Sequence, residues 1–298
     1  VADFQPSGFR TMTPAGPPLK RKPLLPSLKV PHFLLVGDPQ KPEAAPLARQ
    51  IQTLLLEHKA TVSMDFSGSY EPIETKPDFV IVLGGDGAIL AVSHRMGKRR
   101  VPVMGVNLGK VGFLASVSAS RVADVLELVF EGKARTEDRA MMSFAVKRDG
   151  EVVVDSHVLN EIVVQRVAKK NLLTVDFVDE GRHVCTWDGD GVIVSTATGS
   201  TAYNLSAGGP ILAPSLDALV IQPLAPHMLG MRSLVLRADR YFTLKVYQQS
   251  SLTSDGHLEG KLKAGDRIRI GPSRRRLELV VDPQNRFYAR LRSKLHWG

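Results

Sequence analysis

The segment that most constrains the fold is a continuous apolar run, Phe79–Leu83, that ends directly in Gly84-Gly85-Asp86-Gly87. Uninterrupted runs rich in β-branched residues are typical of parallel strands that are buried on both faces. Residues 88–93 follow as a mainly apolar stretch that indicates a helix. A strand, a glycine turn and a helix in this order form the repeating unit of a parallel sheet covered by helices.

The neighbouring segments continue this alternation. The apolar run His32–Gly37 predicts another strand, and Ala48, Ile51, Leu54 and Leu55 share one face of a helix after it. A strand over 101–106 and a helix over about 120–130 complete the series. Residues 31–132 are therefore predicted to form a three-layer α/β domain.

The pattern changes after about residue 133, where helical periodicity becomes scarce. Short β-type runs separated by turn residues predict a β-rich second domain over residues 133–274. The runs lie at 144–146, 152–154, 162–165, 173–177, 192–195, 241–246 and 277–281. Residues 1–30 are rich in Pro, Gly and Lys without apolar periodicity, so we expect a flexible basic extension that is not part of the fold.

Length and composition narrow the class of protein. A chain of 298 residues is longer than one hydrophobic core comfortably serves, which favours two domains. No apolar run approaches the roughly 18 residues of a membrane span, and the single cysteine, Cys185, excludes an intramolecular disulfide. The net charge of +9 is scattered among short basic groups without interleaved aromatics, so we expect solvated surface and no nucleic-acid partner. We expect a cytoplasmic protein without a membrane partner.

The glycine turn at 84–87 can carry chemistry. Its glycines let backbone amides approach a phosphate chain closely, and the N-terminus of the following helix favours an anion. A carboxylate inside such a turn, Asp86, is electrostatically costly unless it accepts a proton or binds a metal. The alternative interpretation is a tight turn in which Asp86 is the N-cap of the helix.

A second segment, 188–210, is dense in Ser, Thr and Gly and supplies hydroxyl and amide donors but little core volume. It indicates a loop and helix around a polar ligand, and the alternative is a long surface loop with local Ser and Thr turns.

Two further patterns are weak alone. Asn160-Glu161 precedes a strand and offers groups for an adenine edge and ribose hydroxyls, and 107–114 combines a glycine turn with one cation, Lys110.

Taken together, six segments resemble the NAD kinase family in their order and spacing, from roughly residue 32 to the end. They are 84–87, 107–114, 160–161, 196–210, 223–227 and 294–298. The Gly-Gly-Asp-Gly element is shared with diacylglycerol kinases, sphingosine kinases and phosphofructokinases. The run Thr-Gly-Ser-Thr-Ala-Tyr-Asn-Leu-Ser-Ala-Gly-Gly-Pro-Ile at 198–211 is specific to the family.

The resemblance implies an enzyme that transfers the terminal phosphoryl group of ATP to the 2′-hydroxyl of the adenosine ribose of NAD, giving NADP and ADP. Asp86 matches the catalytic base. The residues that match the NAD site are Asp86, Gly87, Asn160, Glu161, Asn171, Asp188, Asp190, Thr201, Ala202, Tyr203, Asn204, Leu205, Ser206 and His257. The phosphate-binding positions are Gly84, Gly85, Gly87 and Lys110. For His257, simple exposure in a turn is an equal alternative.

The same resemblance implies a Rossmann-like first domain, a β-sandwich-like second domain and a final segment, 275–298, that completes the first. It also implies Mg²⁺ carried with ATP, no committed metal-binding residue, and a homodimer or homotetramer. Ala197, Gln222 and Met231 depart from the usual family residues, and none of them removes a catalytic group. The alternatives are a diacylglycerol-type lipid kinase, which has no use for 201–206, and a non-catalytic NAD sensor, which has no need for Asp86.

Overall fold

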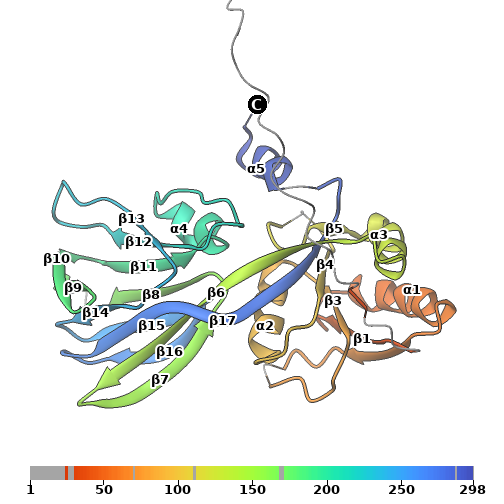
Figure 1. The fold of residues 1–298 in the computed structure, drawn as a ribbon, viewed down its shortest axis with the longest axis horizontal. Coiled ribbons are helices and arrows are strands. Elements are labelled where there is room, and N and C mark those ends of the chain that lie inside the picture. Colours follow the sequence, from red (N-terminus) through yellow and green to blue (C-terminus); the bar gives the residue numbers. More distant parts are fainter. Residues whose placement is uncertain are drawn as a thin grey trace, which may run out of the picture.

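The computed structural model of the chain describes residues 24–25, 30–69, 71–109, 112–167, 171–285 and 287–297. Figure 1 shows an α/β part and a β-sandwich part joined by two long strands. Within these described ranges the strands form two sheets, one of eleven strands and one of six. The predicted fold class, α/β plus all-β, is confirmed.

Parallel strands form the centre of the α/β part, in the order β4, β3, β1, β2. Their bounds are β1 His32–Gly37, β2 Thr61–Asp65, β3 Phe79–Leu83 and β4 Val103–Asn107, with the short β5, Val117–Ser118, beside β4. Strand β4 therefore starts two residues later than the predicted 101–106.

Alternate side chains of these strands contact helices on opposite faces of the sheet. Phe33, Leu35 and Ile81 pack in one cluster with α1 (Ala44–Glu57) and α3 (Val122–Phe130). Leu34 and Val80 pack in another with α2 (Asp86–Arg95). The predicted helix over 120–130 is divided, because a 3-10 turn, η1 (Ala119–Arg121), precedes α3. Helices on both faces give the three layers that the sequence predicted.

The sandwich encloses its own core between two layers of strands. One layer is the six-stranded sheet, in the order β13, β12, β11, β8, β15, β16. Its strands are β8 Glu161–Arg166, β11 Gly191–Thr196, β12 Ala218–Leu224, β13 Leu234–Arg237, β15 Ser250–Ser254 and β16 His257–Leu262. The other layer contains β6 Arg135–Arg148, β7 Glu151–Val158, β9 Leu173–Asp179, β10 Arg182–Gly189, β14 Phe242–Val246 and β17 Arg267–Val281. Phe144, Val194 and Leu252 meet in this core, which is centred between the layers.

Two-residue turns set the register of the sandwich hairpins. Asp149-Gly150, Glu180-Gly181 and Asp255-Gly256 each have positive φ at both positions, from 45° to 89°. Such pairs form the turns whose twist matches paired antiparallel strands, and glycine adopts the second position without steric cost. They connect β6 to β7, β9 to β10 and β15 to β16.

Strands β6 and β17 join the two parts. They pair antiparallel from Arg267 opposite Lys147 to Val281 opposite Arg135, with a register shift between Pro272 and Arg276. Strand β17 also pairs with β4, so one sheet runs through both parts. After β17 the chain returns to the α/β part, where Asn285 Nδ2 donates to the Ser116 carbonyl at 2.8 Å. Helix α5, Phe287–Leu295, follows.

Leu24 and Leu25 pack against the core cluster of α1 and α3. These two residues lie inside the predicted 1–30 extension, so the expectation that this extension is not part of the fold does not hold for them. The rest of it, 1–23 and 26–29, lies outside the described residues. No helix in the described part of the chain is long and apolar enough to cross a membrane.

Candidate active site

Asp86 lies at the first position of α2, directly after β3 and the two preceding glycines. Its carboxylate accepts three backbone N–H groups: Oδ2 accepts from Phe113 at 2.8 Å, and Oδ1 accepts from Leu114 at 3.0 Å and Ala115 at 2.9 Å. The N-cap of α2 is Gly85, and Asp86 makes no side-chain capping bond. The N-cap interpretation of Asp86 is therefore wrong, because the side chain turns away from the helix to hold residues 113–115.

Gly112 permits this contact. A Cβ atom at Gly112 would overlap the carboxylate of Asp86, so only glycine allows the 112–115 segment to lie so close to it. Just before this segment in the chain, Asn107 Oδ1 accepts the N–H of Gly109 at 2.6 Å and forms a local turn. Lys110, predicted to bind phosphate, lies outside the described residues.

The glycine turn borders a cavity of about 660 Å³. Gly84, Gly85 and Gly87 line it on one side, and residues 37–41, after β1, line it on the other. Strand β1 lies between β2 and β3, so the chain leaves β1 toward one side of the sheet and β3 toward the other. Crevices at such switch points, beyond the carboxyl ends of parallel strands, are where open α/β sheets bind nucleotides. The cavity can hold a phosphate chain against the glycine amides.

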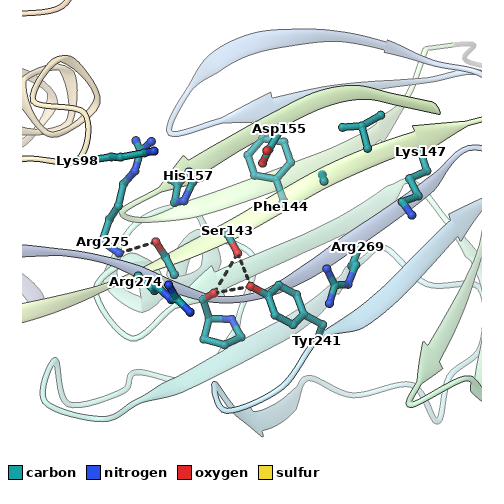
Figure 2. Close-up of a pocket in the computed structure, with 14 residues that line it drawn as sticks. Lys98, Ser143, Phe144, Lys147, Asp155, His157, Tyr241, Arg269, Arg274 and Arg275 are labelled. Carbon is teal, nitrogen blue, oxygen red and sulfur yellow. Dashed lines mark hydrogen bonds between the residues drawn. The ribbon is translucent and has the colours of Figure 1, made fainter.

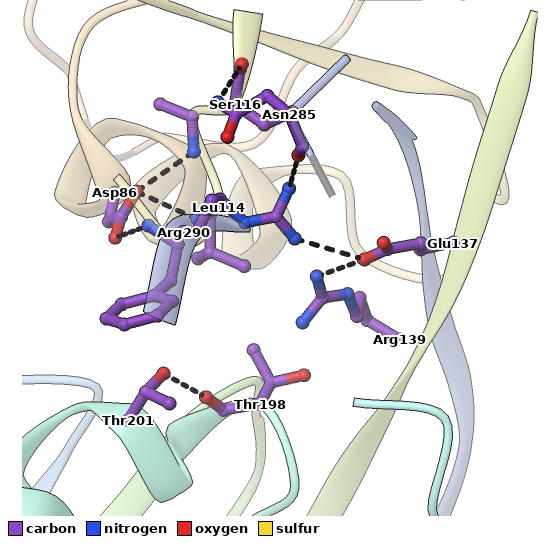
Figure 3. Close-up of polar contacts among 11 residues, drawn as sticks. Asp86, Leu114, Ser116, Glu137, Arg139, Thr198, Thr201, Asn285 and Arg290 are labelled. Carbon is purple, nitrogen blue, oxygen red and sulfur yellow. Dashed lines mark hydrogen bonds and ion pairs between the residues drawn. The ribbon is translucent and has the colours of Figure 1, made fainter. Parts of the chain in front are cut away.

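Two buried arginines lie near Asp86 (Figure 3). Arg139 comes from β6 and is 2% exposed, and Arg290 comes from α5 and is 1% exposed. Both are close to the carboxylate of Glu137: Arg139 Nη2 donates to it, and Arg290 Nη2 lies 3.6 Å from its Oε2. Arg290 Nη1 donates to the Asn285 carbonyl at 2.5 Å. We call Glu137, Arg139 and Arg290 the arginine cluster.

Charge is not balanced within the arginine cluster. Burial lowers the pKa of both guanidinium groups, while Glu137 and Asp86 act in the opposite direction. Among the described residues, Arg139 Nε and Arg290 Nε and Nη2 have no hydrogen-bond partner. Buried donors without acceptors cost free energy, and this cost falls when an anion supplies the missing acceptors.

Asn160 and Glu161 lie together at the start of β8, both buried. Asp255 fixes their backbone: its Oδ1 accepts the N–H of Asn160 at 2.8 Å and of Glu161 at 3.2 Å. Burial and the nearby charge of Asp255 raise the pKa of Glu161 to about 8. Its Oε2 is buried without a partner among the described residues. At neutral pH the Glu161 carboxyl is therefore protonated and can donate one hydrogen bond to a ligand.

The segment 196–206 packs beside this pair. The N–H of Thr196 donates to the Asn160 carbonyl at 2.8 Å, and Thr196 Oγ1 donates to the Leu159 carbonyl at 2.6 Å. The chain continues through η2 (Gly199–Thr201) into the short helix α4 (Tyr203–Ser206). Figure 3 shows Thr198 and Thr201 across from Asp86, with the guanidinium of Arg139 extending between Arg290 and Thr198. The structure thus brings together the Asp86 turn, the Asn160-Glu161 pair and the 196–206 segment.

Side chains within this segment differ in what they contact. Tyr203 is 41% exposed and accepts from Gln165 Nε2 at 3.2 Å. Asn204 is fully buried and donates to the carbonyls of Ser200 and Pro210, so it shapes the segment. The other positions are exposed or half-buried: Thr201, Ala202, Leu205 and Ser206.

The remaining predicted NAD-site residues lie at strand ends of the sandwich. Asp190 Oδ1 accepts from Arg166 at 2.6 Å, and Asp188 Oδ1 accepts from Thr174 Oγ1 at 2.6 Å. Asn171 is exposed just before β9. The exposed His257 lies edge-on to His94 of α2, with ring centroids 6.5 Å apart.

A separate cavity of about 740 Å³ lies on the outer face of β6, β7 and β17 (Figure 2). Its lining is basic, with Lys98, Lys147, Arg269, Arg274 and Arg275, and it contains none of the predicted site residues. The glycines that flank Asp86 line the cavity of about 660 Å³ instead.

No group of three or more His, Cys, Asp or Glu side chains that could hold a metal ion occurs in the described part of the chain. Mg²⁺ prefers few protein ligands and uses waters and substrate phosphates. The one carboxylate of the glycine turn, Asp86, already accepts three backbone N–H groups.

The arginine cluster was missed in the sequence. One signal was present: Arg139 has the strand phase of the buried Met141, and Arg290 lies beside the buried Leu291 in α5. A charged side chain at a buried position of a strand or helix indicates a paired or ligand-binding group. Arg139 and Arg290 come together only because the chain returns to the α/β part before α5.

Comparison with known proteins agrees with this geometry. Residues 68–134 match the ATP-NAD kinase N-terminal domain, and residues 159–281 match the ATP-NAD kinase C-terminal domain. The fold is similar to that of a yeast NADH kinase solved in complex with NADH, with a TM-score of 0.81 and 23% identity over 90% of this chain and 88% of that chain. It is also similar to an NAD kinase from Archaeoglobus fulgidus solved in complex with ATP, with a TM-score of 0.72 and 24% identity over 89% and 98% of the two chains.

Relatives found by sequence have a higher identity to this chain than these two structures. An NAD kinase from Geotalea daltonii is 37% identical over 256 residues, which cover 85% of this chain and 90% of the relative. An NAD kinase from Magnetococcus marinus is 40% identical over 231 residues, covering 76% of each chain. With the Asp86 turn, the Asn160-Glu161 pair and the 196–206 segment assembled around one site, these matches show that the chain belongs to the NAD kinase family.

Proposed function

We propose that this NAD kinase transfers the terminal phosphoryl group of ATP to the 2′-hydroxyl of the adenosine ribose of NAD, with Asp86 as general base. One observation carries the assignment of the base. Asp86 stands in the glycine turn whose Gly84, Gly85 and Gly87 line the cavity that suits donor phosphates, and Figure 3 shows it across from Thr198 and Thr201. A carboxylate at this junction can reach a hydroxyl that faces the donor.

The proton acceptor in this proposal is Oδ2 of Asp86. A carboxylate oxygen has two lone pairs, and Oδ1 already accepts two amides whereas Oδ2 accepts one. Oδ2 takes the proton as the ribose O2′ forms a bond to the terminal phosphorus. The bond from that phosphorus to the bridging oxygen breaks, and its electron pair leaves with ADP. Positioning and charge neutralisation supply most of the catalysis in such transfers.

The NAD site of the proposal consists of the predicted residues on the sandwich side. Protonated Glu161 offers a donor, and the 201–206 segment offers hydroxyl and aromatic groups. The yeast relative in fold was solved with NADH and the archaeal one with ATP, which supports a dinucleotide and ATP as the two substrates. Mg²⁺ enters the proposal with ATP, bound through its phosphates.

We also propose a homo-oligomer and a cytoplasmic location. The proposed domains are residues 31–132, completed by 275–298, and residues 133–274. The loop between β12 and β13 supports an oligomer, because Leu229 is 92% exposed and Met228 is 54% exposed. Large exposed apolar side chains often mark contacts between subunits. The free Cys185 supports a reducing compartment.

The test is to incubate the full chain with Mg-ATP and either NAD, NADH or a diacylglycerol, and to identify the phosphorylated product. We expect NADP from NAD. A phosphorylated lipid, or binding of NAD without turnover, would contradict the proposal. Replacement of ATP by inorganic polyphosphate in the same assay identifies the donor.

A further inference from the structure

We propose that Arg139 and Arg290 form a preorganised binding site for the phosphoryl group in transfer. This inference rests on the proposed function and assigns residues that none of the motifs contains. The site would take a phosphate monoester or metaphosphate-like group, held between two guanidinium groups opposite the base.

The first argument is charge. Two buried cations share the single carboxylate of Glu137, whose side chain is 30% exposed. A clamp that only joins β6 to α5 needs one arginine and one carboxylate. The charge of the second arginine is offset only by Asp86, whose carboxylate bonds to the amides of residues 113–115 and to neither guanidinium group in the described part of the chain.

The second argument is the free donors. Arg139 Nε and Arg290 Nε have no hydrogen-bond partner among the described residues, and Arg290 Nη2 makes only the 3.6 Å ion pair with Glu137. Phosphate oxygens match guanidinium N–H groups in pairs, and such charge-assisted bonds are the strong ones. Thr198 Oγ1 is also buried without a hydrogen-bond partner among the described residues.

The third argument is fixed orientation. Arg290 is anchored by the Asn285 carbonyl, and Asn285 in turn is anchored by Ser116. Arg139 is held by Glu137. Donors that are fixed before the substrate arrives stabilise a transition state without reorganisation at the moment of reaction. Figure 3 shows both arginines near Asp86, the proposed base, and the charge of Asp86 acts on both guanidinium groups.

The experiment compares ATP with ADP, which lacks the transferred group. In Arg139→Gln and Arg290→Gln, titration calorimetry should show a fall of about tenfold or more in ATP affinity and a smaller fall in ADP affinity. Turnover should fall by roughly 10²-fold to 10³-fold. The control is Arg274→Gln in the separate basic cavity, which removes one arginine charge outside the site. Equal losses of ATP and ADP affinity would overturn the inference.

The variant Glu137→Gln tests the same inference even if the arginine variants do not fold. If the cluster is an anion site, removal of the competing carboxylate should tighten ATP and lower its KM, whereas a purely structural clamp should weaken ATP and lower the melting temperature. A weaker ATP complex in folded Glu137→Gln would therefore also overturn the inference. An inactive wild-type chain would instead contradict the proposed function, so the two failures are distinguishable.

Discussion

His94 Nε2 lies 2.8 Å from Oδ2 of Asp255, so helix α2 of the α/β part is bonded to a fully buried carboxylate of the sandwich. The same carboxylate accepts the backbone N–H groups of Leu159, Asn160 and Glu161. The helix that begins at Asp86 and the strand that begins at Glu161 are thereby held in one relative position. The negative charge of Asp255 also acts on the carboxyl group of Glu161, whose Oε2 has no hydrogen-bond partner among the described residues.

The first prediction concerns the pH dependence of stability. The folded protein keeps a proton on Glu161 up to a pKa of about 8, whereas the unfolded chain releases it near 4.5. Between these values the folded state binds more protons, so the free energy of unfolding falls as pH rises, by at most about 1.4 kcal/mol per pH unit from this group. Glu161→Gln should flatten that slope in urea unfolding at pH 5, 6, 7 and 8.

The exposed Glu57→Gln is the matched control and should keep the wild-type slope. The same slope in Glu161→Gln and wild type would show that Glu161 is ionised in the folded protein.

The second prediction concerns Asp86→Asn. Asn keeps the size of the side chain but cannot act as the base, so turnover should fall by roughly 10²-fold to 10⁴-fold with smaller changes in KM. Because the carboxylate accepts three amides, we also expect a loss of about 1–3 kcal/mol in unfolding free energy, measured by urea denaturation. Near wild-type turnover at saturating NAD and Mg-ATP would remove Asp86 from catalysis.

A third prediction tests the position of the base without removing it. In Gly112→Ala the new methyl group would overlap the Asp86 carboxylate and displace it. Displacement by about 1 Å can cost roughly 10²-fold in rate, and overpacking costs about 1–3 kcal/mol. Gly230→Ala, where a Cβ meets no atom within 4 Å, is the control for both measurements. Unchanged kinetics in Gly112→Ala would mean that the contact with residues 113–115 is dispensable.

The fourth prediction concerns the NAD segment. Tyr203→Ala and Ser206→Ala should raise the KM for NAD more than that for ATP, because these side chains lie on the sandwich side, away from the glycine-lined cavity. Tyr247→Ala is a suitable comparison, since Tyr247 has the same exposure of 41% and its hydroxyl is also hydrogen-bonded on the sandwich, to Lys245 and Asp176. Equal effects on both substrates, or none in folded variants, would exclude this segment from NAD binding.

The fifth prediction separates two parts of the N-terminal segment. Deletion of residues 1–23 should leave turnover and stability near those of the full chain. The double variant Leu24→Ala, Leu25→Ala should instead lose roughly 2 kcal/mol of unfolding free energy, because these side chains pack on the core of the α/β part. Thermal unfolding distinguishes them, and a destabilised deletion variant would show that residues before Leu24 also contribute.

The parts of the fold that were predicted correctly have strong local signals. Strand β3 and its glycine turn, helix α1 and most sandwich strands follow from apolar runs and periodicity. Strands β2, β5, β10, β12, β13, β15 and β16 were missed. In β10 and β16 few positions are buried, since each lies at the edge of a sheet, so their apolar signal is weak. The Asp255-Gly256 pair was the available signal for the β15–β16 hairpin.

The candidate site has a sequence signal where one segment carries its groups, as at Asp86 and 198–206. It was not predictable where tertiary structure joins distant residues. Arg139 and Arg290 are 151 positions apart, as their numbers give, and only the return of α5 brings both to Glu137. The Asp255 carboxylate likewise reaches Asn160 because β15 pairs with β8.

The ribbon of β6 and β17 limits how the two parts of the molecule can move. Paired strands do not slide, because sliding breaks every hydrogen bond of the ladder at once, but they bend and twist where the pairing is interrupted. The register shift between Pro272 and Arg276, opposite residues 140–142, is such a point. Any bend there would change the angle between the α/β part and the sandwich, and the pair of Leu277 and Arg139 lies directly beside that point.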